Sequence, residues 1–270
     1  MFKISWLRSI FTMELRQILT YRADFWVNFV GNASITFILA YFLWAAIFEA
    51  NQAQTLNGYN MQDIVLYYLI VPQLFRIQQG SGIGSISREI YEGTLNKYLL
   101  YPINYYALKI IIYFAHTTFY ILQLFLIMFL YWIFTGQEGV LSFSATQLFL
   151  FLISLYFVSL LYFAMSSISE LIAFWADNIW SLGVIIRFLT SFLGGALIPL
   201  SFFPDWAQSI LYKTPFPYLI SFPYETLTKP LDISTYIGNM IILVAWISLF
   251  MFLSYFVWNK GKYKYTGVGI

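Results

Sequence analysis

The sequence contains no cysteine and a single histidine, His116. The missing cysteine excludes disulfide scaffolds, cysteine-based zinc sites and thiol chemistry, and one histidine leaves little for a histidine-rich metal site. Charged residues make up only 10% of the chain, whereas a soluble domain carries roughly a quarter. So few polar groups could not cover a water-exposed surface, and lipid must therefore be the solvent for much of this protein.

Nucleotide-binding and catalytic motifs are also lacking. The glycines Gly80, Gly82 and Gly84 match neither the spacing of a phosphate-binding P-loop nor the dinucleotide fingerprint. No nucleophile–base arrangement stands out, and nearly every acid lies at a predicted helix end or in a loop. Ion-coupled secondary transporters usually keep an ionisable group near the membrane midplane, so this placement argues against that class.

Apolar residues are abundant, at 60% of the chain with 22% aromatic, and the mean hydropathy is +0.73. Apolar runs long enough to cross the hydrocarbon core recur along the chain. These runs predict an all-α polytopic membrane protein, a single transmembrane domain over residues 1–270. Its six transmembrane helices are expected at about residues 25–48, 63–79, 105–134, 145–168, 179–200 and 233–258.

Residues 1–22 are predicted to form an amphipathic helix on the membrane surface. Apolar residues recur at helical spacing between Ile4 and Ile18, and cations such as Arg8 and Arg16 flank them. This segment lacks a short apolar core followed by a small-residue cleavage site, so we expect no cleaved signal peptide.

Polar side chains interrupt several predicted spans. In the first span they recur every four residues from Asp24 to Thr36, a line that joins helices by hydrogen bonds or borders a pathway. Arg76 lies in the inner half of the second span, where Pro72 is expected to kink the helix. The candidate contacts of a translocation path are Asn28, Asn32, Arg76, Arg187 and Ser191.

Two of the intramembrane polar residues have two interpretations each. Arg187 lies about two turns inside the fifth span, where a charge is costly unless it is paired or faces water. It forms an ion pair with Asp177, Glu170 or Asp24, or it contacts an anionic group of the cargo. His116 is either a packing histidine or part of a proton relay, and its surroundings in the sequence favour packing.

The longest polar interruption in the first half of the chain runs from Gly80 to Pro102. The glycines break the preceding helix, and a short amphipathic helix over residues 85–93 is predicted to follow. Ile86 and Ile90 share one face of this helix, Arg88, Glu89 and Glu92 lie elsewhere, and Gly93 ends it. Such a helix is a bilayer anchor or a surface that another protein binds.

Residues 202–225 are rich in proline and aromatic residues. They are too apolar for a free loop and too interrupted by proline for a spanning helix. One or two short re-entrant helices in the outer leaflet are therefore expected here.

The distribution of lysine and arginine predicts the orientation. With the N-terminus inside, only Lys213 and Lys229 lie outside, and both termini and residues 85–93 face the cytoplasm. The cations then placed in the cytoplasm are Lys3, Arg8, Arg16, Arg22, Arg88, Lys97, Lys260, Lys262 and Lys264.

Three short runs, taken in order, resemble the permease subunits of ABC-2 type exporters, in the branch called ABC-2 family transporter proteins. They are Tyr21-Arg22-Ala23-Asp24-Phe25, the run from Glu92-Gly93-Thr94-Leu95 to Tyr101-Pro102, and Pro199-Leu200-Ser201-Phe202-Phe203-Pro204-Asp205-Trp206. The second run is the most specific, although Asn96 stands where an acid is more usual. The resemblance covers the whole chain in order and spacing.

The resemblance implies a permease without its own nucleotide site and without enzymatic activity. ATP and Mg would be bound by separate ABC ATPase subunits. A second permease, a copy or a paralogue, would complete a homo- or heterodimer in a prokaryotic plasma membrane, with lipids and no nucleic acid as further partners. The residues implied in ATPase coupling are Ile86, Arg88, Glu89, Ile90, Glu92, Gly93 and Lys97.

This resemblance favours the protein-binding interpretation of residues 85–93, because residues 1–22 already form a surface anchor. The function expected is export of an amphiphilic or lipid-like substrate, driven by the partner ATPase. Two alternatives belong to other classes: a membrane-embedded enzyme of lipid metabolism, and a small ion-coupled secondary transporter. The cargo itself is left open by the sequence.

Overall fold

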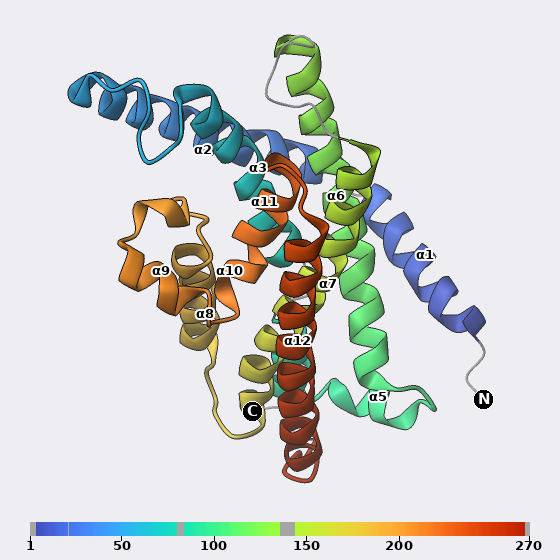
Figure 1. The fold of residues 1–270 in the computed structure, drawn as a ribbon. Coiled ribbons are helices and arrows are strands. Elements are labelled where there is room, and N and C mark those ends of the chain that lie inside the picture. The colour runs from blue at the N-terminus through green and yellow to red at the C-terminus, as the bar shows by residue number, and fades with distance from the viewer. Residues whose placement is uncertain (1–3, 21, 80–83, 136–143, 268–270) are drawn as a thin grey trace.

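The structure is a computed structural model that describes residues 4–20, 22–79, 84–135 and 144–267. Within these residues the chain is helical, with no strand (Figure 1). The predicted all-α fold is therefore confirmed. Of the glycines that interrupt the predicted helices near position 80, Gly80 and Gly82 lie outside the described residues.

Four helices of the described chain are long and apolar enough to cross a membrane. They coincide with the first, third, fourth and sixth predicted spans, because these segments are continuous apolar runs. The helices are α2 (Arg22–Asn51), α6 (Tyr105–Thr135), α7 (Ala145–Leu171) and α12 (Ile233–Gly261).

The second and fifth predicted spans fall on two less apolar or shorter helices. Helix α3 (Met61–Gln79) carries Asp63 and Arg76, which lower its hydropathy. Helix α8 (Trp180–Leu193) is apolar but has only 14 residues; at 1.5 Å per residue it is about 21 Å long, short of the hydrocarbon thickness. It ends before Leu200 because Gly195 has a φ of +96°, outside the helical region. The six-span count stays a prediction.

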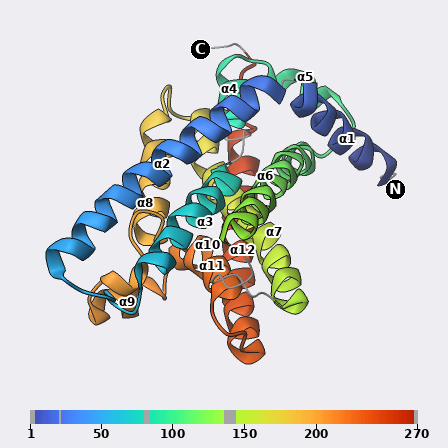
Figure 2. The same ribbon diagram turned by 90° about the horizontal axis from the view of Figure 1, so that it is seen from above.

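Helix α7 is the centre of the molecule. It packs against α12, α3, α6 and α11, and both views place it among these helices (Figures 1 and 2). Small hydroxyl residues allow close approach to α12: the hydroxyls of Ser167 and Ser254 lie 3.0 Å apart, and Ser254 also bonds the carbonyl of Ala164 at 3.0 Å. Any movement of α7 must therefore be accommodated by most of the other long helices.

Helix α1 (Ile4–Thr20) lies along α6 (Figure 1). His116 of α6 contacts Glu14 of α1, with Nε2 and Oε2 3.6 Å apart. Burial raises the pKa of Glu14, and nearby Lys109 acts in the opposite direction. The contact joins His116 to α1, and a packing role for His116 stays a prediction. That α1 lies in the membrane interface stays a prediction.

Short helices replace a spanning helix between α8 and α12, as the prolines predict. After the 3-10 turn η2 (Leu200–Phe202) come α9 (Asp205–Leu211), α10 (Phe216–Leu219) and α11 (Ser221–Thr228). Helices α10 and α11 are largely buried and contact α7. Their depth in a membrane stays a prediction.

Two glycines of α12 allow a matched test of its packing. A Cβ added to Gly261 would lie 2.1 Å from Cδ2 of Phe174, whereas one added to Gly238 would meet nothing within 4 Å. We expect Gly261→Ala to destabilise the fold by about 1–3 kcal/mol through overpacking. Gly238→Ala should be neutral or stabilising, because alanine favours a helix over glycine. Thermal unfolding in detergent measures both, and equal shifts would contradict this account of the contact between Gly261 of α12 and Phe174, in the 3-10 turn Ile172–Phe174 that follows α7.

Candidate coupling site

The polar stretch between α3 and α6 forms two short helices, α4 (Ser85–Tyr91) and α5 (Leu95–Leu100). Gly84 with φ +88° precedes α4, and Gly93 with φ +71° follows it. Both conformations favour glycine, so the sequence sets the two ends of α4. The two helices lie at the end of the molecule that also holds the C-terminal part of α12 (Figure 2).

The apolar face of α4 is covered by the protein itself. Ile86 and Ile90 are buried, at 2% and 3% exposure, in a cluster with Leu95, Leu171 and Ile179. This apolar face therefore supports α4 on the end of α7 and is not available to insert into a bilayer. The structure thus disfavours a bilayer anchor for residues 85–93.

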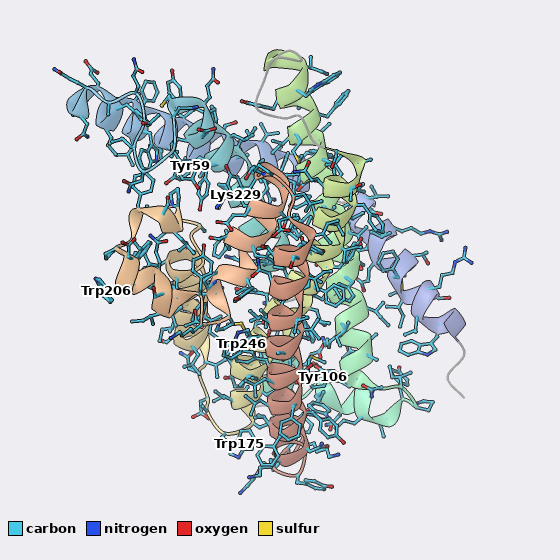
Figure 3. All side chains as sticks on the ribbon, in the orientation of Figure 1. Tyr59, Tyr106, Trp175, Trp206, Lys229 and Trp246 are labelled. Carbon is cyan, nitrogen blue, oxygen red and sulfur yellow. The ribbon has the colours of Figure 1, made fainter. Side chains whose placement is uncertain are left out.

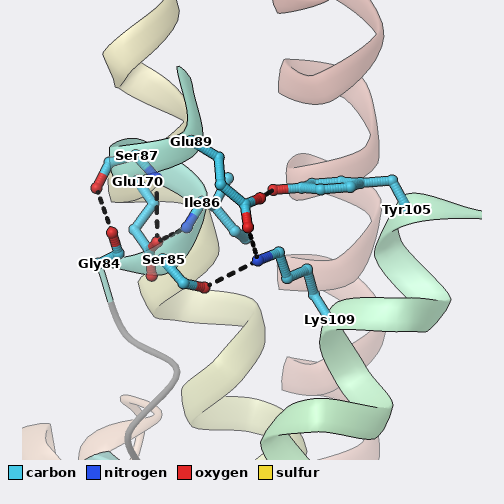
Figure 4. Close-up of polar contacts among 8 residues, drawn as sticks. All are labelled: Gly84, Ser85, Ile86, Ser87, Glu89, Tyr105, Lys109 and Glu170. Atoms are coloured by element: carbon cyan, nitrogen blue, oxygen red, sulfur yellow. Dashed lines mark hydrogen bonds and ion pairs between the residues drawn. The ribbon is translucent and has the colours of Figure 1, made fainter. Parts of the chain in front are cut away.

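A buried carboxylate on α7 holds the first turn of α4. Glu170, 4% exposed, accepts hydrogen bonds from the backbone N–H groups of Ile86 at 2.8 Å and Ser87 at 3.3 Å (Figure 4). The first N–H groups of a helix have no partner within it and carry a partial positive charge, so a carboxylate is a suitable acceptor. Glu170 thereby attaches α4 to a central helix of the fold.

A second attachment joins α4 to α6. Lys109 Nζ lies 2.7 Å from Oε1 of Glu89 and 3.2 Å from Oγ of Ser85, and the Tyr105 hydroxyl donates to Glu89 (Figure 4). The Lys109 and Glu89 side chains are 6% and 14% exposed. Removing one partner of a buried pair leaves an uncompensated charge and costs about 3–5 kcal/mol. Helix α4 is therefore held by two helices at once.

The remaining face of this region is open. Arg88 and Glu92 at the end of α4 and Lys97 on α5 are exposed. Tyr91 is fixed beside them, because its hydroxyl donates to the carbonyl of Ala176 at 3.0 Å. Burial and the nearby Asp177 raise the pKa of Tyr91, which keeps its hydroxyl protonated as a donor. A charged surface on a rigidly held helix is suited to contact another protein.

This arrangement agrees with what known sequences show. A family model described as ABC-2 family transporter protein matches residues 34–269, nearly the whole chain. The chain belongs to this family. Among curated proteins, no match to the chain is found. The match confirms the resemblance inferred from the sequence, and the second and third of the three runs lie within the matched residues. Members of the ABC-2 family are membrane permeases of ABC transporters and associate with ABC ATPase subunits.

The candidate translocation residues of this ABC-2 permease do not form one group. Arg76 and Ser191 line the same cavity of about 410 Å³ between α2, α3 and α8, together with Thr36. The Arg76 guanidinium lies 5.3 Å from the ring centres of both Phe29 and Tyr120, a cation–π arrangement. The side chains of the other two candidates in the first span, Asn28 and Asn32, lie outside the described residues.

Arg187 lines a different cavity, of about 460 Å³, next to α4. Arg88, Glu92 and Glu170 share this cavity. Among the ion pairs of the described side chains, none joins Arg187 to Glu170 or Asp177. The Glu170 carboxylate is bonded to the α4 backbone instead. Asp24, the third predicted partner, has its side chain outside the described residues.

The sequence by itself did not assign Glu170, Lys109 and Tyr105 to the candidate coupling site of the permease. Lys109 and Glu170 each lie near the end of a long apolar helix. A charged residue just inside such a helix end, close to a short amphipathic helix in the sequence or the topology, is the signal that could have indicated them. Of the residues that the sequence did assign, Ile86 and Ile90 are buried and pack α4 onto the rest of the protein. Gly93 ends α4, and Lys97 is exposed.

Proposed function

We propose that this chain is the membrane-spanning subunit of an ATP-driven exporter and binds its ATPase through the exposed face of α4 and α5. The supporting observation is that α4 is clamped by Glu170 and Lys109 while Arg88 and Glu92 stay exposed. A helix that is fixed to the spans and charged on its outer face meets both requirements of a coupling element.

The clamp explains how an external movement would reach the spans. ATP and Mg bind to the separate ATPase, whose closure displaces α4. Because Glu170 ties α4 to α7 and Lys109 ties it to α6, the displacement passes into both helices instead of bending a loop. The packing of α7 against α12 and α3 then spreads it through the molecule. The expected result is a change of access that expels an amphiphilic or lipid-like substrate outward.

The distribution of charge supports a cytoplasmic location for α4. The C-terminal end of α12 with Lys260, Lys262 and Lys264 lies at the same end of the molecule as α5, and α1 begins toward that end (Figure 1). The α2–α3 connection lies at the opposite end. Under the positive-inside rule, the first end faces the cytoplasm of a prokaryotic cell. In this proposal α3 and the segment 179–200, of which α8 is the α-helical part, complete the set of six spans.

The same proposal includes a second permease, either a copy of this chain or a paralogue. ABC ATPases act as pairs, so two permeases present two coupling surfaces. The cavity with Arg76 and Ser191 and the cavity with Arg187 are the proposed contacts for polar groups of the cargo. Both contain a cation within the helical part of the chain.

Copurification tests the proposed function directly. The tagged chain, expressed with an ABC ATPase from the same source, is expected to retain that ATPase in detergent and to show vanadate-sensitive ATP hydrolysis after reconstitution. An ATPase variant lacking its P-loop lysine provides the control, because it should copurify without hydrolysis. If no ATPase copurifies and reconstitution gives no vanadate-sensitive hydrolysis, the exporter function fails.

A further inference from the structure

Consecutive apolar residues are exposed at the end of α5. Leu99, Leu100 and Tyr101 are 44%, 83% and 58% exposed, whereas Leu95 at the start of α5 is fully buried. Helix α5 therefore begins against the protein and ends away from it. A run of exposed apolar residues is unfavourable in water and marks a surface that binds a partner. We call Leu99, Leu100 and Tyr101 the α5 tip.

The local sequence sets the shape of the α5 tip. Tyr101 precedes Pro102, a position that disfavours helical backbone, and it has an extended conformation with φ −81° and ψ 143°. The backbone N–H of Ile103 then donates to the carbonyl of Tyr101 at 2.8 Å. The side chain of Asn104 accepts the N–H of Ala107 at 3.0 Å, in the first turn of α6. A short turn thus joins the tip to α6, and the position of α6 determines that of the tip.

The length of α6 places the α5 tip at a bilayer surface. The 31 residues of α6 span about 46 Å at 1.5 Å per residue, and a bilayer with its headgroups measures about 40–45 Å. A helix of this length that crosses the membrane has its first residue, Tyr105, at the level of the headgroups. Only residues 102–104 separate Tyr105 from the tip, so the tip lies at the same level.

Exposed aromatic residues mark the same level. Trp175, labelled in Figure 3, lies at the same end of the molecule as α5 and is 49% exposed. Trp180 at the start of α8 is 71% exposed. Tryptophan and tyrosine are enriched where a protein meets lipid headgroups. Tyr101 of the α5 tip has this same character, which favours lipid as the partner of the tip.

The α5 tip lies on a different side of the molecule from the charges proposed to bind the ATPase. Arg88 and Glu92 line a cavity together with Gly183 and Arg187 of α8. Helices α8 and α1 lie on opposite sides of α7, and α5 lies on the side of α1 in both views (Figures 1 and 2). An apolar surface at the periphery, level with the headgroups, is placed to meet lipid.

We propose that the α5 tip inserts into the lipid leaflet at this end of the molecule. Leu99 and Leu100 enter the outer part of the hydrocarbon, and Tyr101 stays among the headgroups because its ring is apolar and its hydroxyl is polar. Lipid then holds the outer end of α5, while Glu170 and Lys109 hold α4. This insertion depends on the membrane-spanning fold and not on the proposed contact with an ATPase.

Spin labelling tests the insertion, because the chain has no cysteine of its own. Leu100→Cys provides one site for a nitroxide on the full chain, reconstituted in nanodiscs of phosphatidylcholine and phosphatidylglycerol. Collisions of the label with oxygen, which concentrates in hydrocarbon, are compared with collisions with a water-soluble nickel chelate. The oxygen-to-nickel ratio should be severalfold higher than for Tyr263→Cys. Tyr263 is the matched control, because it is also 83% exposed and lies after α12 between Lys262 and Lys264.

Further variants separate the preference of the α5 tip from that of the label. Tyr101→Cys should give the same high ratio, and it carries the test if thermal unfolding shows that Leu100→Cys is not folded. Leu99→Ser combined with Tyr101→Ser should lower the ratio at position 100, because the apolar neighbours hold this position in lipid. An equal ratio with and without these two serines would show that the nitroxide itself enters lipid, and would overturn the proposal.

An ABC ATPase from the same source distinguishes a lipid-binding surface from a protein-binding one. Its addition should leave both collision rates at position 100 unchanged. A nickel rate above the oxygen rate at this position, or a loss of both rates when the ATPase is added, would overturn the lipid surface. A label introduced by Lys97→Cys should lose nickel collisions when the ATPase binds. Unchanged collisions at position 97 count against the ATPase contact alone, so the two failures are distinguished.

Discussion

Glu170→Ala is expected to remove most of the permease-dependent stimulation of the ATPase while the chain still inserts and folds. The substitution leaves the N–H groups of Ile86 and Ser87 without their acceptor. A buried N–H without an acceptor costs about 1–3 kcal/mol, which shifts the equilibrium from clamped to loosened α4 by a factor of about 5 to 150. A loosened α4 follows the ATPase without moving α7. The ATPase rate of the reconstituted complex, with and without permease, measures this loss.

Conservative variants separate this positioning role from a general loss of stability. Glu170→Gln keeps an acceptor oxygen at the same place and should retain much of the stimulation, whereas Glu170→Ala should not. Amide hydrogen exchange adds a local readout, because Ile86 and Ser87 should exchange faster in Glu170→Ala while α12 stays protected. Glu49→Ala, at an exposed acid near the far end of α2, is the matched control. Full stimulation with exposed α4 amides would refute the clamp as the coupling path.

Glu92→Arg is expected to weaken ATPase binding about tenfold or more, because a reversed charge at an interface costs several kcal/mol through unfavourable pairing. Glu92 is exposed, so the fold should change by no more than about 0.5 kcal/mol. Titration of the purified ATPase against the reconstituted permease measures the affinity.

The control for this variant is Glu49→Arg, which makes the same charge change near the far end of α2. It should bind the ATPase as the wild type does. In the double variant Arg88→Glu with Glu92→Arg, the two charges exchange places and the net charge is unchanged. Its affinity for the ATPase shows whether the positions of the charges matter or only their sum. If Glu92→Arg binds with wild-type affinity, the exposed face of α4 is not the coupling surface.

The local elements of this protein followed from its sequence, since their causes are local. Continuous apolar runs predict α2, α6, α7 and α12. Gly84 and Gly93 set the ends of α4 because each adopts a positive φ. Prolines divide the segment after α8 into short helices, because proline has a fixed φ and no backbone N–H to donate within a helix.

The contacts on which the proposed coupling depends join residues far apart in the chain. Glu170 is separated from Ile86 by 84 positions, and no local pattern states that its carboxylate meets the first turn of α4. A polar cavity of about 380 Å³ likewise combines Tyr59 with Tyr212 and Glu225. Composition and periodicity report which face of a helix is apolar, but the partner of that face depends on how the helices pack. Hydropathy therefore defined the helices of this permease, and packing around α7 determined which side chains meet.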